Sequence, residues 1–297
     1  MNVGIIGCSG SRFKEIYLPF FIEKKRENRI NFIKVFNRTK EAADNVSKIL
    51  QSGVAEDIDD IIYDENIDLI FLIVTEKVRK LILKKNLRHK KTFVTEVPAI
   101  KNIIEYHILR RNLKTQNINL FIFEDRYYLY KKIFKEFLHN NITNIILQNI
   151  EWMHHAYGAF AALNIKKKLD RVKYIKNRNS DEFIFTYTNF KFHYIFENNK
   201  KNNVRESGKI FLKNDNNLNL EFSFSKKDYA FLKNRSINSF FDDNENNFKN
   251  LKEDNYLTYH LKGEAIFVTT IKIFKLIKIE WFAKFIIFLL IKLHILR

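Results

Sequence analysis

Short apolar runs recur along the first 125 residues and alternate with stretches of helical periodicity. The runs lack alternating polar positions, which indicates strands buried on both faces of a sheet. The apolar runs are Asn2–Gly7, Ile30–Phe36, Ile67–Thr75, Thr92–Thr95 and Asn119–Phe123. The helical stretches are Tyr17–Lys25, Thr39–Leu50, Lys77–Leu87 and Ala99–Leu113. This alternation of strands and helices predicts an α/β fold with a doubly wound parallel sheet.

The pattern changes in the second half of the chain. Ile142–Trp152 is typical of a strand, and a basic segment, Lys166–Lys173, follows it. Shorter runs then come between Asn-rich turns, a pattern that predicts an antiparallel sheet. These runs are Glu182–Asn189, Lys191–Phe196, Lys209–Lys213 and Leu218–Phe224. Because 297 residues are at the upper limit of one hydrophobic core, we expect two domains, residues 1–124 and 125–297.

The last part of the chain combines a polar stretch with a very apolar end. Asp242–Asn255 is polar and predicts a loop, and Tyr256–Leu276 is typical of a helix. Ile279–Arg297 is apolar but carries Lys284 and Lys292, and it is shorter in apolar residues than the roughly 20 that a membrane-spanning helix needs. Two interpretations stay open. This final helix is either buried against a sheet or a partner subunit, or it lies peripherally in a membrane interface.

The net charge and the cysteine content indicate which kinds of binding site and partner the chain is expected to have or to lack. Lys and Arg number 52 and Asp and Glu 34, a balance of +18 that raises the question of nucleic-acid binding. The lysines are scattered without a block of five or six like charges, so we favour a general surface bias over a nucleic-acid site. One cysteine excludes a disulfide framework and a Cys-rich metal site. His154 and His155 have no third ligand at suitable spacing, so we expect no metal. No signal-peptide pattern opens the chain, so a cytoplasmic location is expected.

The turn after the first apolar run carries the richest candidate chemistry. In a dinucleotide-binding fold this turn is glycine-rich, and the next helix N-terminus holds the pyrophosphate. Gly7 stands at the first glycine position of GxGxxG, whereas Ser9 and Arg12 stand at the second and third. The candidate pyrophosphate-binding residues are Gly7, Cys8, Ser9, Gly10, Ser11 and Arg12. An ordinary strand–helix turn is the alternative.

Asn37 and Arg38, at the end of the second apolar run, are the candidate adenosine-ribose residues. An acidic residue at this place would bind the ribose 2′-hydroxyl of NAD, whereas an arginine accommodates a 2′-phosphate. The chain has no acidic residue there, so we favour NADP over NAD. The alternative is a solvent-exposed arginine at a strand end.

An ordered set of motifs over about residues 1–140 resembles the Gfo/Idh/MocA oxidoreductases. The motifs are NVGIIGCSGSR, LPFF with Pro19, IDLIFLIVTEK, KKTFVTEVPAI and FEDRYYLYKKIFKEF. The resemblance implies an N-terminal Rossmann domain that binds NAD(P), with Thr75, Glu96 and Pro98 near the nicotinamide half. It also implies an α+β C-terminal domain with an open, mostly antiparallel sheet, one face of which serves a homo-oligomer.

The resemblance further implies hydride transfer to or from a hydroxyl carbon of a sugar, nucleotide-sugar or cyclitol. The family's Glu-Lys-Pro lysine is Val97 here, and valine has no polar atom to relay a proton. Glu151 and His155 reproduce the family's Asp-to-His spacing, so this pair is the candidate acid/base, with His154 as an equal candidate. The alternative is a catalytically inactive relative that binds a nucleotide or a partner protein.

Overall fold

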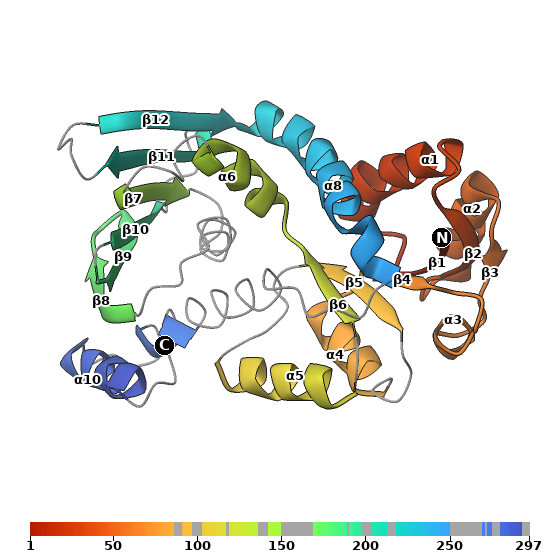
Figure 1. The fold of residues 1–297 in the computed structure, drawn as a ribbon, viewed down its shortest axis with the longest axis horizontal. Coiled ribbons are helices and arrows are strands. Elements are labelled where there is room, and N and C mark those ends of the chain that lie inside the picture. Colours follow the sequence, from red (N-terminus) through yellow and green to blue (C-terminus); the bar gives the residue numbers. More distant parts are fainter. Residues whose placement is uncertain are drawn as a thin grey trace. The chain divides into compact units, whose positions relative to one another are not determined.

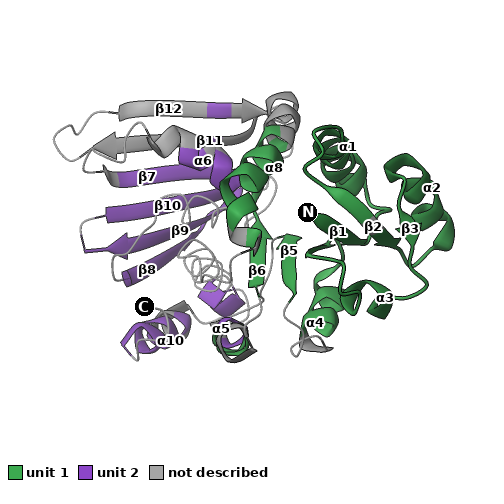
Figure 2. Ribbon diagram, turned by 45° about the vertical axis from the view of Figure 1, so that its right-hand side comes forward, with its two compact units in different colours: residues 1–100, 107–125, 233–258 green, residues 101–106, 126–232, 259–297 purple. Residues whose placement is uncertain are grey.

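A computed structural model of the chain describes most of its residues (Figure 1). The described ranges are 1–85, 91–96, 103–116, 119–135, 142–149, 169–188, 190–197, 204–212, 218–249, 269–270, 272–274 and 280–292. The chain divides into two compact units (Figure 2). The first comprises Met1–Ile100, His107–Asp125 and Lys233–Thr258; the second comprises Lys101–Tyr106, Arg126–Leu232 and Tyr259–Arg297. The expected boundary at residue 124 stays a prediction.

A six-stranded parallel sheet forms the centre of the first unit, in the order β3-β2-β1-β4-β5-β6. Its strands are β1 Asn2–Ile6, β2 Asn31–Phe36, β3 Gly53–Val54, β4 Leu69–Leu72, β5 Thr92–Glu96 and β6 Asn119–Phe123. This is the strand order of the Rossmann fold, so the predicted doubly wound sheet is confirmed. The two-residue strand β3 was not predicted, because so short a strand leaves no apolar run in the sequence.

Helices cover both faces of this sheet. A π-helical turn, Phe13–Tyr17, continues into α1. The helices of this unit are α1 Leu18–Arg26, α2 Lys40–Leu50, α3 Asp59–Ile62, α4 Glu76–Lys85 and most of α5 Ile103–Gln116. Helix α6, Asp125–Lys135, belongs to the second unit from Arg126 on. Figure 1 shows α1 and α2 on one side of the sheet and α3 and α4 on the other. This double cover explains why the strands are apolar throughout.

An aromatic cluster fixes the first helix against the sheet. Tyr17 and Phe21 are fully buried, and their rings lie 6.1 and 5.0 Å from the Phe71 ring of β4. Tyr17 also meets Phe123 of β6 edge-on at 6.1 Å. Such edge-to-face pairs add stability beyond their buried area. The cluster therefore holds the first helix, and the turn before it, across the carboxyl half of the sheet.

The polar stretch Asp242–Asn255 was predicted to be a loop, and this prediction is wrong for its first half. Helix α8 runs from Lys226 to Lys249. Phe240, Phe241 and Phe248 are buried on its apolar face. Its polar face is tied to the first unit by Arg29, which bonds Asp242 at 2.8 Å and also pairs with Glu245. A polar sequence thus forms a helix because tertiary contacts stabilise both its apolar face and its polar face.

A six-stranded mixed sheet forms the second unit, in the order β12-β11-β7-β10-β9-β8 (Figure 2). Its strands are β7 Ile142–Asn149, β8 Leu169–Lys176, β9 Ser180–Tyr187, β10 Phe190–Glu197, β11 Val204–Leu212 and β12 Leu218–Ser225. Only β10 and β7 pair in parallel among these strands, so the mostly antiparallel sheet is confirmed. The basic segment Lys166–Lys173 was not predicted to contain a strand. In β8, however, buried Leu169 and Val172 are interleaved with exposed charged residues.

The apolar end of the chain forms α10, Glu280–Lys292, which packs against β8. Ala283, Ile287 and Ile291 are buried, whereas Phe285 and Phe288 are about half exposed. In the described part of the chain, no helix has the length and apolar character to cross a membrane. Of the predicted helix Tyr256–Leu276, residues 269–270 and 272–274 are described, and they are helical.

Candidate functional site

The carboxyl edge of the parallel sheet gathers most of the candidate residues. Strand β1 lies between β2 and β4, so the chain order reverses at β1, and ligands of open α/β sheets bind at this switch point. The residues from Gly7 to Arg12 follow β1, and Asn37 and Arg38 follow β2. Thr75 follows β4 and Glu96 ends β5. The topology therefore brings residues that lie far apart in the sequence to one edge.

Gly7 makes the tight turn that the sequence predicted. Its φ is +93°, a left-handed conformation that glycine adopts without strain. A Cβ atom here would overlap the carbonyl oxygen of Ile73 and lie 2.8 Å from Val74 Cγ1. The Gly7 N–H donates to the Phe36 carbonyl at 2.9 Å. The turn after β1 therefore passes against the loop after β4 at a distance that only glycine allows.

The side-chain amide of Asn37 stabilises this turn by hydrogen bonds. Its Oδ1 accepts the Cys8 N–H at 3.1 Å, and its Nδ2 donates to Thr39 Oγ1 at 2.8 Å. The Cys8 side chain is buried with its Sγ 3.6 Å from the Ala42 carbonyl, and burial raises the pKa of the thiol to about 11. Cys8 is thus a neutral packing residue, and Asn37 shapes the loop with both ends of its amide.

The outer part of the turn is open to solvent. Ser9, Gly10 and Ser11 are exposed, and a Cβ on Gly10 would meet nothing within 4 Å. The helix begins at Ser11, and the first N–H groups of a helix have no acceptor within it. These donors and the helix dipole favour an anion. Arg38 is exposed just after β2, the strand beside β1.

Arg12 reaches in the opposite direction, across the sheet to β5. Its Nε donates to Glu96 Oε1, and the Tyr17 hydroxyl donates to the same oxygen at 2.8 Å. Its Nη1 lies 3.6 Å from Oδ2 of the buried Asp125. Burial alone would lower the pKa of Arg12, but the charges of Glu96 and Asp125 outweigh it and hold that pKa well above its ordinary value. Arg12 is therefore a permanent cation held by two carboxylates.

Two further residues of this cluster support Glu96. Tyr17 is fully buried, and burial together with the Glu96 charge raises its pKa well above the ordinary value, so it stays a neutral donor. Arg79 is also buried, and its Nη1 donates to the Glu96 carbonyl at 2.8 Å and to Thr95 Oγ1 at 3.1 Å. Neither residue was predicted from the sequence, because their partner Glu96 is 79 and 17 positions away and no local pattern indicates these contacts.

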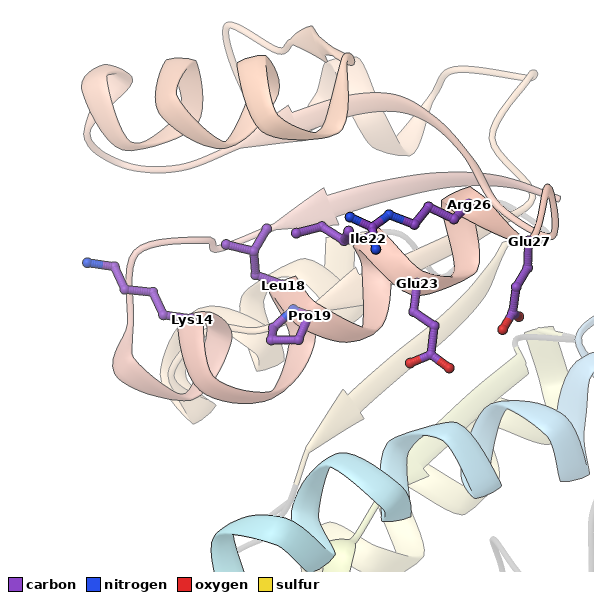
Figure 3. A pocket seen from close by; sticks show the side chains of 7 residues that line it. All are labelled: Lys14, Leu18, Pro19, Ile22, Glu23, Arg26 and Glu27. Carbon is purple, nitrogen blue, oxygen red and sulfur yellow. The ribbon is translucent and has the colours of Figure 1, made fainter.

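A surface pocket of about 640 Å³ lies elsewhere, along the exposed side of α1 (Figure 3). Its lining residues are Lys14, Leu18, Pro19, Ile22, Glu23, Arg26 and Glu27. None of them is a candidate residue of the carboxyl edge. This pocket therefore does not mark the carboxyl edge of the sheet.

The candidate acid/base pair is not among these residues. Glu151 and His155 lie outside the described residues, as do His154, Val97 and Pro98. Their roles stay predictions. Among the described residues, no cluster of His, Cys, Asp and Glu is arranged to hold a metal ion.

The comparisons with known proteins agree with this geometry. Residues 1–122 match the Gfo/Idh/MocA family model, described as an oxidoreductase family with an NAD-binding Rossmann fold. Over these residues the chain is similar to the Gfo/Idh/MocA oxidoreductases. The comparison with curated proteins found no match.

Solved structures are similar to this chain in fold over most of its length. A Gfo/Idh/MocA family oxidoreductase from Vibrio cholerae has a TM-score of 0.68 at 12% identity, covering 90% of this chain and 96% of that one. A putative myo-inositol dehydrogenase from Sinorhizobium meliloti has 0.63 at 10%, covering 89% and 95%. Biliverdin reductase from Synechocystis, in complex with biliverdin and NADP⁺, has 0.59 at 14%, covering 89% and 97%. At these identities the likeness shows the fold alone.

Proposed function

We propose that this chain is an NAD(P)-dependent oxidoreductase that transfers a hydride to or from a hydroxyl carbon of a sugar, nucleotide-sugar or cyclitol. The observation that supports this most strongly is the Gly7 turn at the switch point of a 3-2-1-4-5-6 parallel sheet. The match of residues 1–122 to an NAD-binding oxidoreductase family supports it independently.

The turn fits the diphosphate of a dinucleotide. Gly7 lets the backbone pass close to the loop after β4, and Asn37 fixes the Cys8 N–H. Ser9, Gly10 and Ser11 offer exposed backbone at the start of a helix, where N–H groups can bind an oxyanion. When bound there, the dinucleotide supplies the hydride acceptor or donor, and the protein supplies its position.

The 2′-phosphate form of the cofactor is favoured. Arg38 is exposed at the end of β2, where its planar guanidinium can pair with a phosphate in a bidentate way. The residues directly after β2 are Asn37 and Arg38, so no acidic side chain stands where one would bind a ribose 2′-hydroxyl, and Asn37 uses its amide within the turn. We therefore expect NADP(H) to bind more tightly than NAD(H).

His155, oriented by Glu151, is the proposed acid/base, since Val97 has no group that could relay a proton. A panel of sugars, nucleotide-sugars and cyclitols with each oxidised cofactor tests the activity by the appearance of reduced nicotinamide. His155→Ala should lower turnover strongly with little change in cofactor affinity. Unchanged turnover would remove His155 from the mechanism.

Val97 also favours a second candidate, a catalytically inactive relative that still binds a nucleotide. Its signature is cofactor binding without hydride transfer across the whole panel. Restored transfer in Val97→Lys would then indicate that activity was lost with the lysine.

The open sheet of the second unit supports self-association of the chain. Its buried face carries Phe183, Phe185 and Tyr194, whereas Ile184 and His193, paired across β9 and β10, are half-buried on the other face. An identical face on a second copy would bury these side chains. Light scattering should give a dimer or larger species, and Ile184→Lys should shift it toward the monomer. A monomeric wild-type chain would contradict this.

A further inference from the structure

The Arg12–Glu96 pair has hydrogen-bonding capacity that the described part of the chain does not use. Glu96 Oε1 accepts from both Arg12 Nε and the Tyr17 hydroxyl. Among the described residues, Oε2 of the same carboxylate has no hydrogen-bond partner, and the side chain is 15% exposed. Among the described residues, Arg12 donates a hydrogen bond only through Nε, while its Nη1 forms an ion pair with Asp125 at 3.6 Å, which is beyond hydrogen-bond distance. The pair thus presents a carboxylate acceptor beside guanidinium donors.

The pair is also rigid. Tyr17 is fully buried against Phe71 and Phe123, so its hydroxyl fixes Oε1 from within the core. Arg79 holds the backbone carbonyl of Glu96. Because Tyr17 and Arg79 fix the positions of this donor and acceptor, the pair is preorganised for a ligand, and binding loses less conformational entropy.

Its place on the sheet indicates which half of a dinucleotide it would meet. Arg38 follows β2 on one side of β1, whereas Glu96 ends β5 and Asp125 follows β6 on the other side. A dinucleotide binds across the two mononucleotide halves of this sheet. With the adenosine half at Arg38, the β4–β5–β6 side receives the nicotinamide half.

We propose that Arg12 and Glu96 together recognise the carboxamide group of the nicotinamide. The carboxamide has an acceptor, its C=O, beside a donor, its NH₂. The C=O accepts from the Arg12 Nη groups, and the NH₂ donates to Glu96 Oε2. The flat guanidinium and carboxylate match a flat amide, as they match one another in bidentate pairs. This inference rests on the proposed function and names two residues that would select the intact nicotinamide.

The test compares two cofactors that differ only in this group. In the 3-acetylpyridine analogue of the dinucleotide, a methyl group replaces the NH₂ and the C=O is kept. Dissociation constants for the natural oxidised cofactor, the analogue and ADP-ribose are measured by calorimetry on the full chain. The wild type should bind the natural cofactor roughly tenfold or more tightly than the analogue, the range for a hydrogen bond to a charged group. Glu96→Gln should reduce this ratio to about threefold or less.

A matched control separates this effect from net charge. Glu65→Gln removes the same charge from an exposed residue before the amino end of β4, at the opposite edge of the sheet, and should leave the ratio unchanged. ADP-ribose lacks the nicotinamide, so its affinity should be the same in the wild type and in Glu96→Gln. Melting temperatures show whether each variant is folded. Should Glu96→Gln not fold, Glu96→Asp keeps the charge for Arg12 and shortens the reach, and it should reduce the ratio partly.

Three results would overturn the inference. Equal loss of affinity for the natural cofactor and the analogue in Glu96→Gln would mean that Glu96 binds the ribose diol instead. Tighter binding of all three ligands would mean that Glu96 competes with the diphosphate for Arg12. A wild type that does not distinguish the two cofactors would mean that the carboxamide is not recognised. A wild type that binds none of the ligands would overturn the proposed function itself, which is a different result.

Discussion

Gly7→Ala tests the turn on which the site depends. The substitution adds one Cβ atom, which would overlap the Ile73 carbonyl oxygen and lie 2.8 Å from Val74 Cγ1 and 2.9 Å from the Ile73 carbonyl carbon. Two of these three neighbours are backbone atoms, so the strain cannot be relieved by a rotamer change. The alanine would also have to adopt φ of +93°. A left-handed conformation costs a non-glycine residue about 1–3 kcal/mol, and overpacking of this kind costs about 1–3 kcal/mol.

The expected destabilisation is therefore about 2–6 kcal/mol, a large part of the roughly 5–15 kcal/mol that stabilises a typical domain. Urea unfolding followed by circular dichroism measures it. Gly10→Ala is the matched control, because its Cβ meets nothing within 4 Å and its φ is not positive. We expect that variant to lie within about 0.5 kcal/mol of the wild type. If Gly7→Ala were as stable as Gly10→Ala, the close approach of the turn to Ile73 would be refuted.

Three other substitutions or reactions test separate parts of the structure. Arg29→Ala should destabilise the first unit by about 1–2 kcal/mol in urea unfolding, because Arg29 pairs with Asp242 and Glu245; no loss would mean that it does not hold α8. The buried Cys8 thiol, with its pKa raised to about 11, should not react with a thiol reagent at neutral pH until urea unfolds the chain, and rapid reaction of the folded protein would contradict its burial. Arg38→Gln should weaken NADPH binding by roughly tenfold and leave NADH binding within about twofold; equal losses for both cofactors would rule out a 2′-phosphate contact.

The parallel sheet could be predicted from the sequence because its strands are buried on both faces and so appear as unbroken apolar runs. Strand β8 could not, because Lys173 and other charged residues at its exposed positions hide Leu169 and Val172. The helical state of Asp242–Lys249 was also missed, since its stabilising partner Arg29 lies more than 200 residues earlier. The pattern of residues along the sequence predicts elements that are stabilised locally, whereas both of these elements depend on contacts with distant residues.

The candidate site shows the same division. The position of Gly7 was predictable, because a glycine directly after a buried strand is a strong local signal. The side-chain direction of Arg12 was not, because its partner Glu96 is 84 positions away. Asn37 was predicted to meet the adenosine ribose, but its amide is engaged with Cys8 and Thr39, so its observed contacts lie within the turn. Residue type indicated the chemistry of the site, and the tertiary contacts decided which groups are still available for a ligand.

The most direct test of the account is a titration of the intact chain with NADPH and NADH, followed by nicotinamide fluorescence and by the shift in melting temperature. We expect saturable binding of both forms, tighter for NADPH, with a melting temperature that rises with ligand concentration. Absence of binding by either form would contradict it, because the turn at Gly7 would then hold no dinucleotide in spite of its fold.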